Sequence, residues 1–290
     1  MSTPVAHAPA APETGRLSFA DLAGWGEDDL GAALAAFRLN PAGTEGDARA
    51  FFETRFCPGI PLDGHFTGYF EPEIPASLER SPDFPVPIHT MPEGAVAAPR
   101  SEIEPLLAGH EIAWLRDEVD RFFLQVQGSG RLRLPGGGAM RVGYAGTNGH
   151  DYRSIGKLLV ERGVFGSDIT AEALKDWLHA DPDRGRTVMH ENPSYVMFRP
   201  LDLPEESGPM GTLCPVTPGR SLAIDPAHLP LGTPVWIEVD GMARLCIAQD
   251  TGSAITGSGR ADLFFGTGDA AGRAAGRLNH RGRFIPLVPR

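Results

Sequence analysis

Short apolar runs separated by Pro and Gly turns dominate the last third of the chain. Several of them alternate apolar and polar residues, which is the pattern of a strand that buries one face. We expect strands at residues 194–199, 221–224, 234–239, 245–248, 262–265 and 284–287. One helix, at residues 269–278, interrupts them. This arrangement predicts a compact all-β segment that can close into a small barrel.

The first two thirds of the chain mix helices with fewer strands. Apolar spacing predicts helices over residues 17–39, 47–56, 151–162, 170–179 and 182–190, with Ser18 and Asp21 capping the first of them. Ser101 opens a short helix as the first residue of a capping box. Strands are expected at residues 65–70, 112–115 and 122–127, with a hairpin from 131–134 to 140–144. The whole chain is therefore mainly β with peripheral helices.

Composition and residue spacing exclude several classes of function. The chain has 290 residues and a formal charge of −11, which argues against nucleic-acid binding through a basic surface. No apolar run is long enough to span a membrane. Its three Cys and scattered His lack the spacing of a zinc site, so we predict no metal and no cofactor.

The start of the chain differs from the rest. Residues 1–15 are rich in Pro and Ala, which predicts a disordered tether. They show no basic region followed by an apolar core, and no Cys that could accept a lipid. A signal peptide is therefore not predicted in the chain as given.

Two aspartates stand out near the C-terminus. Asp250 directly follows a buried strand, and Asp262 begins another one twelve positions later. A tight loop between them can aim two carboxyl groups into one cleft, as acid/base chemistry on a glycosidic bond requires. Aspartates at strand ends also cap turns by accepting backbone hydrogen bonds. These residues alone leave both interpretations open.

Two glutamines, Gln125 and Gln127, are expected on one face of the strand at 122–127. Amides placed in this way suit sugar hydroxyl and N-acetyl groups. A polar strand edge facing solvent explains them equally well. The segment from Tyr144 to His150 has the same two interpretations, a ligand-binding loop or a plain one.

Taken together, these segments closely resemble blocks of the membrane-bound lytic murein transglycosylase A family. The matching blocks are FTGYFEP at 66–72, QVQGSG at 125–130, YAGTNGH at 144–150, YRSIGK at 152–157, NPSYV at 192–196 and the segment 250–268. They occur in the family's order and span roughly residues 50–290. The tail also resembles the domain named for its three aspartates.

The resemblance implies an architecture. It predicts a double-psi β-barrel domain formed by residues 16–71 and 192–290, and an inserted β-rich domain formed by residues 72–191, with a glycan groove between them. It also implies a periplasmic protein associated with the outer membrane. Its partners would be peptidoglycan strands and, beyond them, other cell-wall synthesis or division proteins.

The resemblance also implies chemistry. Family members cleave the β-1,4 bond between N-acetylmuramic acid and N-acetylglucosamine without water, because the muramic C6 hydroxyl attacks its own anomeric carbon. The family's catalytic aspartate aligns with Asp262, and its second motif aspartate aligns with Asp250. We take Thr67, Tyr69, Gln125, Gln127, Tyr144 and Asn148 as the candidates that hold the glycan.

An acid working near neutral pH needs a raised pKa. We expect apolar neighbours at Leu263, Phe264 and Phe265, and the negative charge of Asp250, to raise the pKa of Asp262. The same carboxyl would then accept the C6 hydroxyl proton, while Asp250 positions the sugar or Asp262. Three alternatives remain: an inverting hydrolase that uses both aspartates, a glycan-binding or wall-loosening module without catalysis, and a purely structural partner protein without glycan affinity.

Overall fold

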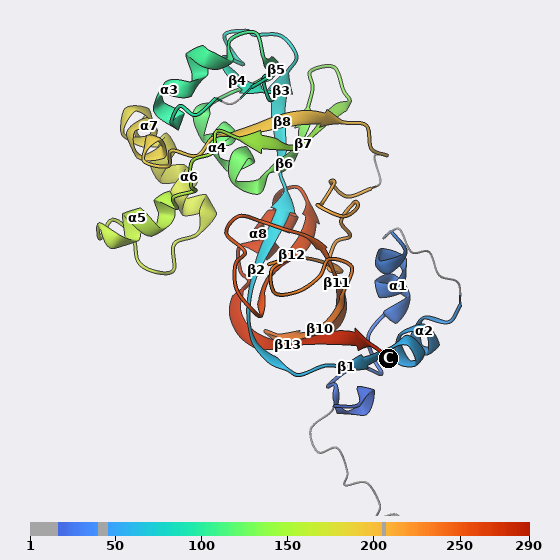
Figure 1. Cartoon of the computed structure of the whole chain (residues 1–290). Coiled ribbons are helices and arrows are strands. Elements are labelled where there is room, and N and C mark those ends of the chain that lie inside the picture. The colour runs from blue at the N-terminus through green and yellow to red at the C-terminus, as the bar shows by residue number, and fades with distance from the viewer. Residues whose placement is uncertain (1–16, 40–45, 95, 205–206) are drawn as a thin grey trace, which may run out of the picture.

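The computed structural model describes residues 17–39, 46–94, 96–204 and 207–290. These form two bodies, which Figure 1 shows one above the other, with β2 (Leu62–Glu71) in the lower body leading up to the upper one. The predicted tether at 1–15 lies outside the described residues. Within the described part, no helix has the length and apolar character needed to cross a bilayer.

The lower body is a closed β-barrel. Its hydrogen-bonded order is β13-β10-β11-β9-β12-β2 and back to β13, and β1 pairs with the end of β13. Two of the pairings are parallel, β9 with β11 and β2 with β12, and the others are antiparallel. The strands are β1 (Phe56–Pro58), β2 (Leu62–Glu71), β9 (Ser221–Ile224), β10 (Pro234–Val239), β11 (Met242–Asp250), β12 (Arg260–Thr267) and β13 (Asn279–Pro289).

Strand β10 shows why the barrel is stable. Val235, Ile237 and Val239 point into the barrel core, whereas Trp236 points outward. The outward face is covered by the N-terminal helices and by the turn that carries Trp25, whose ring packs against that of Trp236. Because both faces are buried, the strand is apolar almost throughout and does not alternate.

The upper body contains the second sheet, ordered β4-β5-β3-β6-β7-β8. The helix at 118–127 packs Leu124 against this sheet, and the helices between residues 155 and 190 pack on the other side of it. The strands are β3 (Glu73–Ser77), β4 (Val86–His89), β5 (Glu111–Leu115), β6 (Ser129–Arg133), β7 (Ala139–Thr147) and β8 (Val196–Leu201).

Most helices lie at the periphery, as predicted. The α-helices are α1 (Leu30–Arg38), α2 (Ala48–Arg55), α3 (Arg100–Ile103), α4 (Glu118–Gln127), α5 (Ile155–Glu161), α6 (Ala171–His179), α7 (Pro182–His190) and α8 (Asp269–Ala275), and the 3-10 helices are η1 (Phe19–Asp21) and η2 (Glu104–Leu107).

Three predicted helices need correction. The expected single helix at 17–39 is split into η1 and α1, because Gly24 takes a left-handed φ of +81° between them. The capping box of Ser18 and Asp21 is confirmed. Ser101 does not cap α3, whose N-cap is Pro99. The helix expected from 151 begins at Ile155, after the cap Ser154.

The segment 122–127 is a helix rather than the predicted strand. It forms the end of α4, which Asp117 caps at its start by accepting from the Asp120 N–H. Gly128 ends the helix in the left-handed region. These two caps are visible in the sequence and indicate a helix, but the apolar run between them also fits a strand.

The strand at 194–199 belongs to a different body from the one predicted. The predicted barrel segment begins at residue 192, yet β8 pairs with β7 in the upper sheet. The switch from predicted helices, which end at 190, to predicted strands, which begin at 194, therefore does not mark the return of the chain to the barrel. The chain leaves the upper sheet only after Leu201.

Candidate active site

The parallel pair β2 and β12 builds the centre of the site. In its register Asp262 lies opposite Thr67, and Phe264 lies opposite Tyr69. Paired residues of a sheet point to the same side, so these four side chains share one outer face of the barrel. The intervening residues Ala261 and Leu263 point into the barrel core. The two halves of the site thus come together from positions 195 apart in the chain.

Asp262 is held by a short hydrogen bond. Thr67 Oγ1 donates to Asp262 Oδ1 at 2.5 Å, and Arg260 Nη2 donates to Thr67 Oγ1 at 2.8 Å. Burial raises the pKa of Asp262 to about 6, while the Thr67 hydrogen bond and the Arg260 charge act in the opposite direction. Asp250 adds a smaller upward effect on this pKa. An acid with this pKa retains a proton at a useful level near neutral pH.

The apolar surroundings of Asp262 differ in part from the prediction. Phe264 shares the face of Asp262, and its ring packs 5.1 Å from that of Tyr69. Leu263 and Phe265 instead pack with the barrel core. The alternation of side chains along a strand separates them from Asp262, so only Phe264 of the three expected residues borders the carboxyl on its own face.

Asp250 ends β11, as predicted, and accepts hydrogen bonds at both carboxylate oxygens. Its Oδ2 accepts from the Tyr69 hydroxyl at 3.0 Å. Its Oδ1 accepts from the Thr212 N–H, the Thr212 hydroxyl and the Thr251 N–H. Burial raises the pKa of Asp250, and these hydrogen bonds oppose that rise. The contacts make Asp250 an anchor for Tyr69 and for the loop at Thr212.

A third aspartate, Asp225, follows the neighbouring strand β9. It accepts from the Gly257 N–H at 2.7 Å and from the Ala227 N–H, which lowers its pKa. Gly257 lies in the loop between β11 and β12. Asp225 therefore supports the connection between the two strands that carry Asp250 and Asp262. It was not among the residues predicted from the sequence.

Gln125 and Asn148 do not reach the site. Gln125 is only 5% exposed on α4; its oxygen accepts from Arg100 and its amide donates to the Val196 carbonyl. Asn148 is only 3% exposed; it donates to the carbonyls of Ala98 and Pro193 and accepts from the Tyr195 N–H. Both amides are therefore used inside the upper body, where they hydrogen-bond to neighbouring segments.

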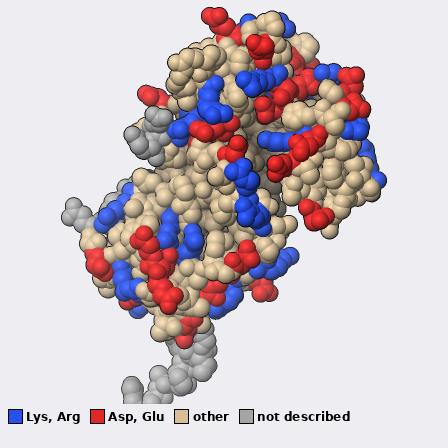
Figure 2. All heavy atoms as spheres, turned by 180° about the vertical axis from the view of Figure 1, so that it is seen from behind, with Lys and Arg blue, Asp and Glu red and all other residues tan. Residues whose placement is uncertain are grey.

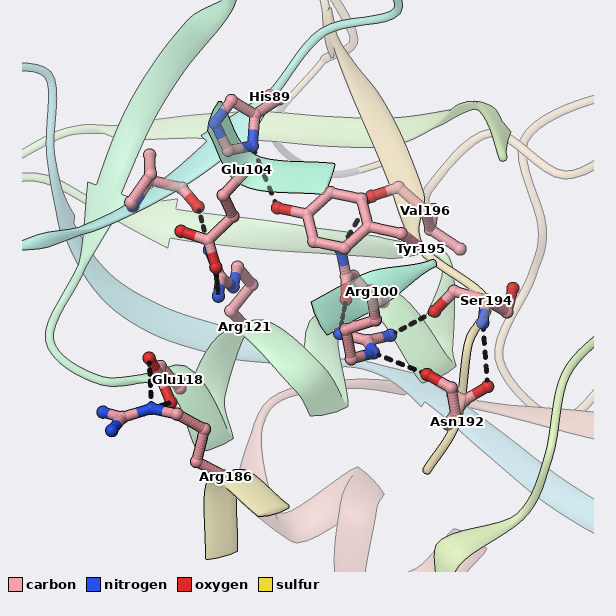
Figure 3. Close-up of polar contacts among 12 residues, drawn as sticks. His89, Arg100, Glu104, Glu118, Arg121, Arg186, Asn192, Ser194, Tyr195 and Val196 are labelled. Atoms are coloured by element: carbon pink, nitrogen blue, oxygen red, sulfur yellow. Dashed lines mark hydrogen bonds and ion pairs between the residues drawn. The ribbon is translucent and has the colours of Figure 1, made fainter. Parts of the chain in front are cut away.

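Figure 3 shows the hydrogen-bond network around Arg100, the residue that donates to Gln125. Arg100 donates to the carbonyls of Asn192 and Ser194, next to the ring of Tyr195, and Tyr195 in turn contacts His89 at 2.9 Å. Such buried donors and acceptors stabilise a fold when all are satisfied. The blocks around 125, 148 and 192–196 therefore join the helices of the upper body to its sheet.

Two of the remaining candidates lie in the upper body near the barrel or solvent. Gln127 accepts from the Phe70 N–H at 3.4 Å, which places its amide beside the end of β2. Tyr144, on β7, is 55% exposed and has a side chain open to a ligand. Thr67 and Tyr69 lie at the two aspartates, where their hydroxyls contact the carboxylates.

Two residues that sequence reasoning missed belong to this site. Arg260 could have been found, because it lies two positions before Asp262 on one strand and so shares its face. Thr212 gave no local signal, since it reaches Asp250 from a loop 38 positions away. Among the described residues, no group of three or more His, Cys, Asp or Glu side chains is arranged to hold a metal ion.

Comparisons with known proteins agree with this arrangement. The family model described as "MltA specific insert domain" matches residues 65–104 and 97–199, and the one described as "3D domain" matches residues 220–288. The first match ends within β8, in agreement with its place in the upper sheet. The fold and the site thus define a barrel protein that carries a 3D domain and this particular insert.

Relatives extend the match over most of the chain. The "Membrane-bound lytic murein transglycosylase A" of Vibrio cholerae is 37% identical over 242 residues, which cover 77% of this chain and 64% of that protein. The crystal structure of a membrane-bound lytic murein transglycosylase from Agrobacterium tumefaciens has a TM-score of 0.82 at 30% identity, covering 94% of this chain and 97% of that one. The chain belongs to the membrane-bound lytic murein transglycosylase A family.

A third comparison concerns a ligand. The structure of E. coli MltA with bound chitohexaose has a TM-score of 0.78 at 29% identity, covering 92% of this chain and 90% of that chain. The chain spans about two thirds of the length of the curated V. cholerae relative, at 64%.

Proposed function

We propose that this protein is a peptidoglycan lytic transglycosylase. It would cleave the β-1,4 bond between N-acetylmuramic acid and N-acetylglucosamine and leave a 1,6-anhydro end. The proposal is carried by the half-buried Asp262, which accepts a hydrogen bond from Thr67 and whose pKa burial raises to about 6. Family membership and the chitohexaose bound to the E. coli relative support the choice of substrate.

A single carboxyl can perform both proton transfers. Asp262 donates its proton to the glycosidic oxygen as the bond to the anomeric carbon breaks. The resulting carboxylate accepts the proton of the C6 hydroxyl as that oxygen bonds to the same carbon. The acid is thereby regenerated, and no water is consumed. Proton transfer of this kind contributes about 10²–10⁴-fold, and orientation of the C6 hydroxyl must supply the rest.

Asp250 favours this reaction over inverting hydrolysis. An inverting enzyme needs a second carboxylate that is free to activate water. Asp250 instead accepts hydrogen bonds from Tyr69, Thr212 and Thr251, which engage both of its oxygens. We therefore assign Asp250 a supporting role, in which it holds Tyr69 beside Phe264 at the site.

The glycan would lie against both bodies. Thr67 and Tyr69 come from the barrel, and Gln127 and Tyr144 come from the upper body. We propose these four side chains, with Asp250 and Asp262, as the wall of a groove between the two bodies. On the face shown in Figure 2, Lys and Arg side chains are interspersed with Asp and Glu side chains, so this face carries no continuous patch of one charge.

The test is digestion of purified murein in water enriched in ¹⁸O, followed by mass spectrometry. The expected product is an anhydro sugar, lighter by one water than the hydrolysis product and free of ¹⁸O. A hydrolase of known inverting mechanism serves as the control and must incorporate the label. Label in the product would replace this proposal with hydrolysis, and binding without soluble release would indicate a non-catalytic glycan-binding module.

The family relationship also supports a location. We propose that the protein works in the periplasm at the outer membrane, because its curated relatives are named membrane-bound. There it would meet peptidoglycan strands and cell-wall synthesis or division proteins. Fractionation of cells and crosslinking of the native protein test this placement.

A further inference from the structure

A chain of two hydrogen bonds leads from Arg260 to Asp262. Arg260 Nη2 lies 2.8 Å from Thr67 Oγ1, and Thr67 Oγ1 lies 2.5 Å from Asp262 Oδ1. A guanidinium group can only donate, whereas a hydroxyl has one hydrogen and two acceptor positions. Arg260 therefore occupies an acceptor position of Thr67. Donation from the charged guanidinium polarises the Thr67 hydroxyl and strengthens it as a donor, which favours the arrangement in which its single hydrogen points at Asp262.

The guanidinium is fixed in this direction by the backbone. Arg260 Nη1 donates to the carbonyl of Ala261 at 2.6 Å and to that of His65 at 3.3 Å. These acceptors lie on β12 and β2, the two strands that carry Asp262 and Thr67. A planar group held at one end by two strands presents its other end in a set direction.

We propose that Arg260 is a positioning residue of the reaction, which makes Thr67 donate to Asp262 Oδ1 and so keeps the acid proton on Oδ2. The inference rests on the proposed function. With Oδ1 serving as acceptor, the proton on Oδ2 passes to the glycosidic oxygen as the bond to the anomeric carbon breaks. The C6 hydroxyl proton then returns to Oδ2 as the C6 oxygen bonds to that carbon, and the protons balance.

Without Arg260, the direction of the Thr67 hydroxyl is no longer set. Asp262 can then carry its proton on Oδ1 and donate to Thr67, in which case the proton points away from the substrate. Only part of the enzyme would hold its acid in the productive form. The loss would appear in kcat, because binding of the glycan does not depend on which oxygen carries the proton.

Arg260 also stabilises the carboxylate that forms after the first proton transfer. Its charge and the Thr67 hydrogen bond both lower the pKa of Asp262, against the effect of burial. The other charged groups that act on Asp262 are Asp250 from β11, which raises this pKa, and His65 from β2, which lowers it. Removing Arg260 should therefore raise the pKa of Asp262.

The first experiment measures kcat, KM and the pH profile of Arg260→Met and Thr67→Val on murein glycan strands. We expect each to lower kcat by about tenfold to a hundredfold, since a charge-assisted hydrogen bond is lost, with KM little changed in Arg260→Met. The alkaline limb of the profile should move to higher pH. Arg260→Lys, which keeps the charge and a donor, should restore most of the rate.

The hydrogen-bonded path from Arg260 through Thr67 to Asp262 is called the relay below. Two further variants distinguish loss of the relay from a general disturbance of the site. The double variant should be no slower than the slower single variant, because both changes break the same path. Arg281→Met removes an exposed positive charge from β13, the strand beside β2, and should leave kcat and the pH limb unchanged. Additive losses in the double variant, or an unmoved limb in Arg260→Met, would overturn the proposal.

Titration of ¹³C-labelled Asp262 by NMR gives a readout that does not need turnover. The pKa of Asp262 should be higher in Arg260→Met and in Thr67→Val than in the wild type. If wild-type protein releases no anhydro product, the proposed function fails while this titration still decides the relay. If the product forms but the pKa stays the same in both variants, the relay fails and the function stands. If Arg260→Met does not fold, Thr67→Val alone provides both the kinetic measurement and the titration.

Discussion

Glu71 and Arg141 form a buried ion pair where the two bodies meet, with Arg141 Nε 2.8 Å from Glu71 Oε1 and no exposed surface on Glu71. Glu71 ends β2 in the barrel, and Arg141 lies on β7 in the upper sheet. Thr267 at the end of β12 also donates to Glu71, and Arg141 donates to the carbonyl of Pro204 on the returning chain. One ion pair thus connects both crossings between the bodies.

Breaking the ion pair between Glu71 and Arg141 should destabilise the fold. We expect Glu71→Gln to lower the free energy of unfolding by about 3–5 kcal/mol, because it leaves the Arg141 charge buried without a counter-charge. Chemical denaturation measures the change. Glu73→Gln is the matched control: Glu73 lies two positions on and pairs with Arg131 at 3.5 Å in a more exposed place. The control should cost about 1 kcal/mol or less, and equal losses in the two variants would contradict the special role of Glu71.

Asp262→Asn should abolish cleavage and retain glycan binding. The amide keeps the shape of the carboxyl but cannot donate and then accept a proton, so we expect a loss of at least about 10²-fold. Release of anhydro sugars measures cleavage, and sedimentation with murein sacculi measures binding. Asp240→Asn, which changes an exposed aspartate at a turn, is the control. Turnover at the wild-type rate in Asp262→Asn would remove Asp262 from the mechanism.

Asp262→Asn should also be more stable toward unfolding than the wild type at pH 7–8. The pKa of Asp262 is raised from its ordinary value of 3.8 to about 6 in the folded protein. A raised folded pKa gives stability below the unfolded pKa that is lost as the pH rises through about 6. Because asparagine does not titrate, Asp262→Asn avoids that loss, by up to about 3 kcal/mol for two pKa units. Thermal unfolding from pH 3 to pH 8 should show the difference growing with pH, and a constant difference would contradict it.

Turnover itself should fall as the pH rises through about 6. Asp262 must carry a proton to begin the reaction, and burial places its pKa near that value. The measurement is kcat against pH on soluble glycan strands, where the falling limb reports the acid in the complex. An unchanged rate from pH 5 to pH 8 would show that another group supplies the proton.

Substitutions at Asn148 and Tyr144 should distinguish an effect on stability from an effect on glycan binding. Asn148→Ala removes an amide that serves three backbone groups, so we expect a loss of about 1–3 kcal/mol in stability. Tyr144→Ala changes an exposed side chain, so stability should stay nearly constant while KM rises. Denaturation and KM measured on the same preparations check both. A raised KM in folded Asn148→Ala would restore that amide to the glycan site.

Local sequence pattern was sufficient where a short segment carries its own signal. The strands predicted at 221–224, 234–239 and 245–248 follow from their apolar runs, and Asp250 at the end of its strand was placed correctly. The helix at 118–127 was missed although Asp117 and Gly128 mark both of its ends. In that segment the apolar run satisfied two periodicities, and local pattern alone does not choose between them.

The sequence by itself determined several residues of the site and the elements that carry them: Thr67 and Tyr69 on one strand, and Asp262 at the start of another. Only the tertiary structure decided that these strands are parallel neighbours with Thr67 opposite Asp262. It also decided that Gln125 and Asn148 are used inside the upper body. The physical reason is that pairing between distant strands and the burial of an amide depend on contacts across the whole chain, which no local periodicity records.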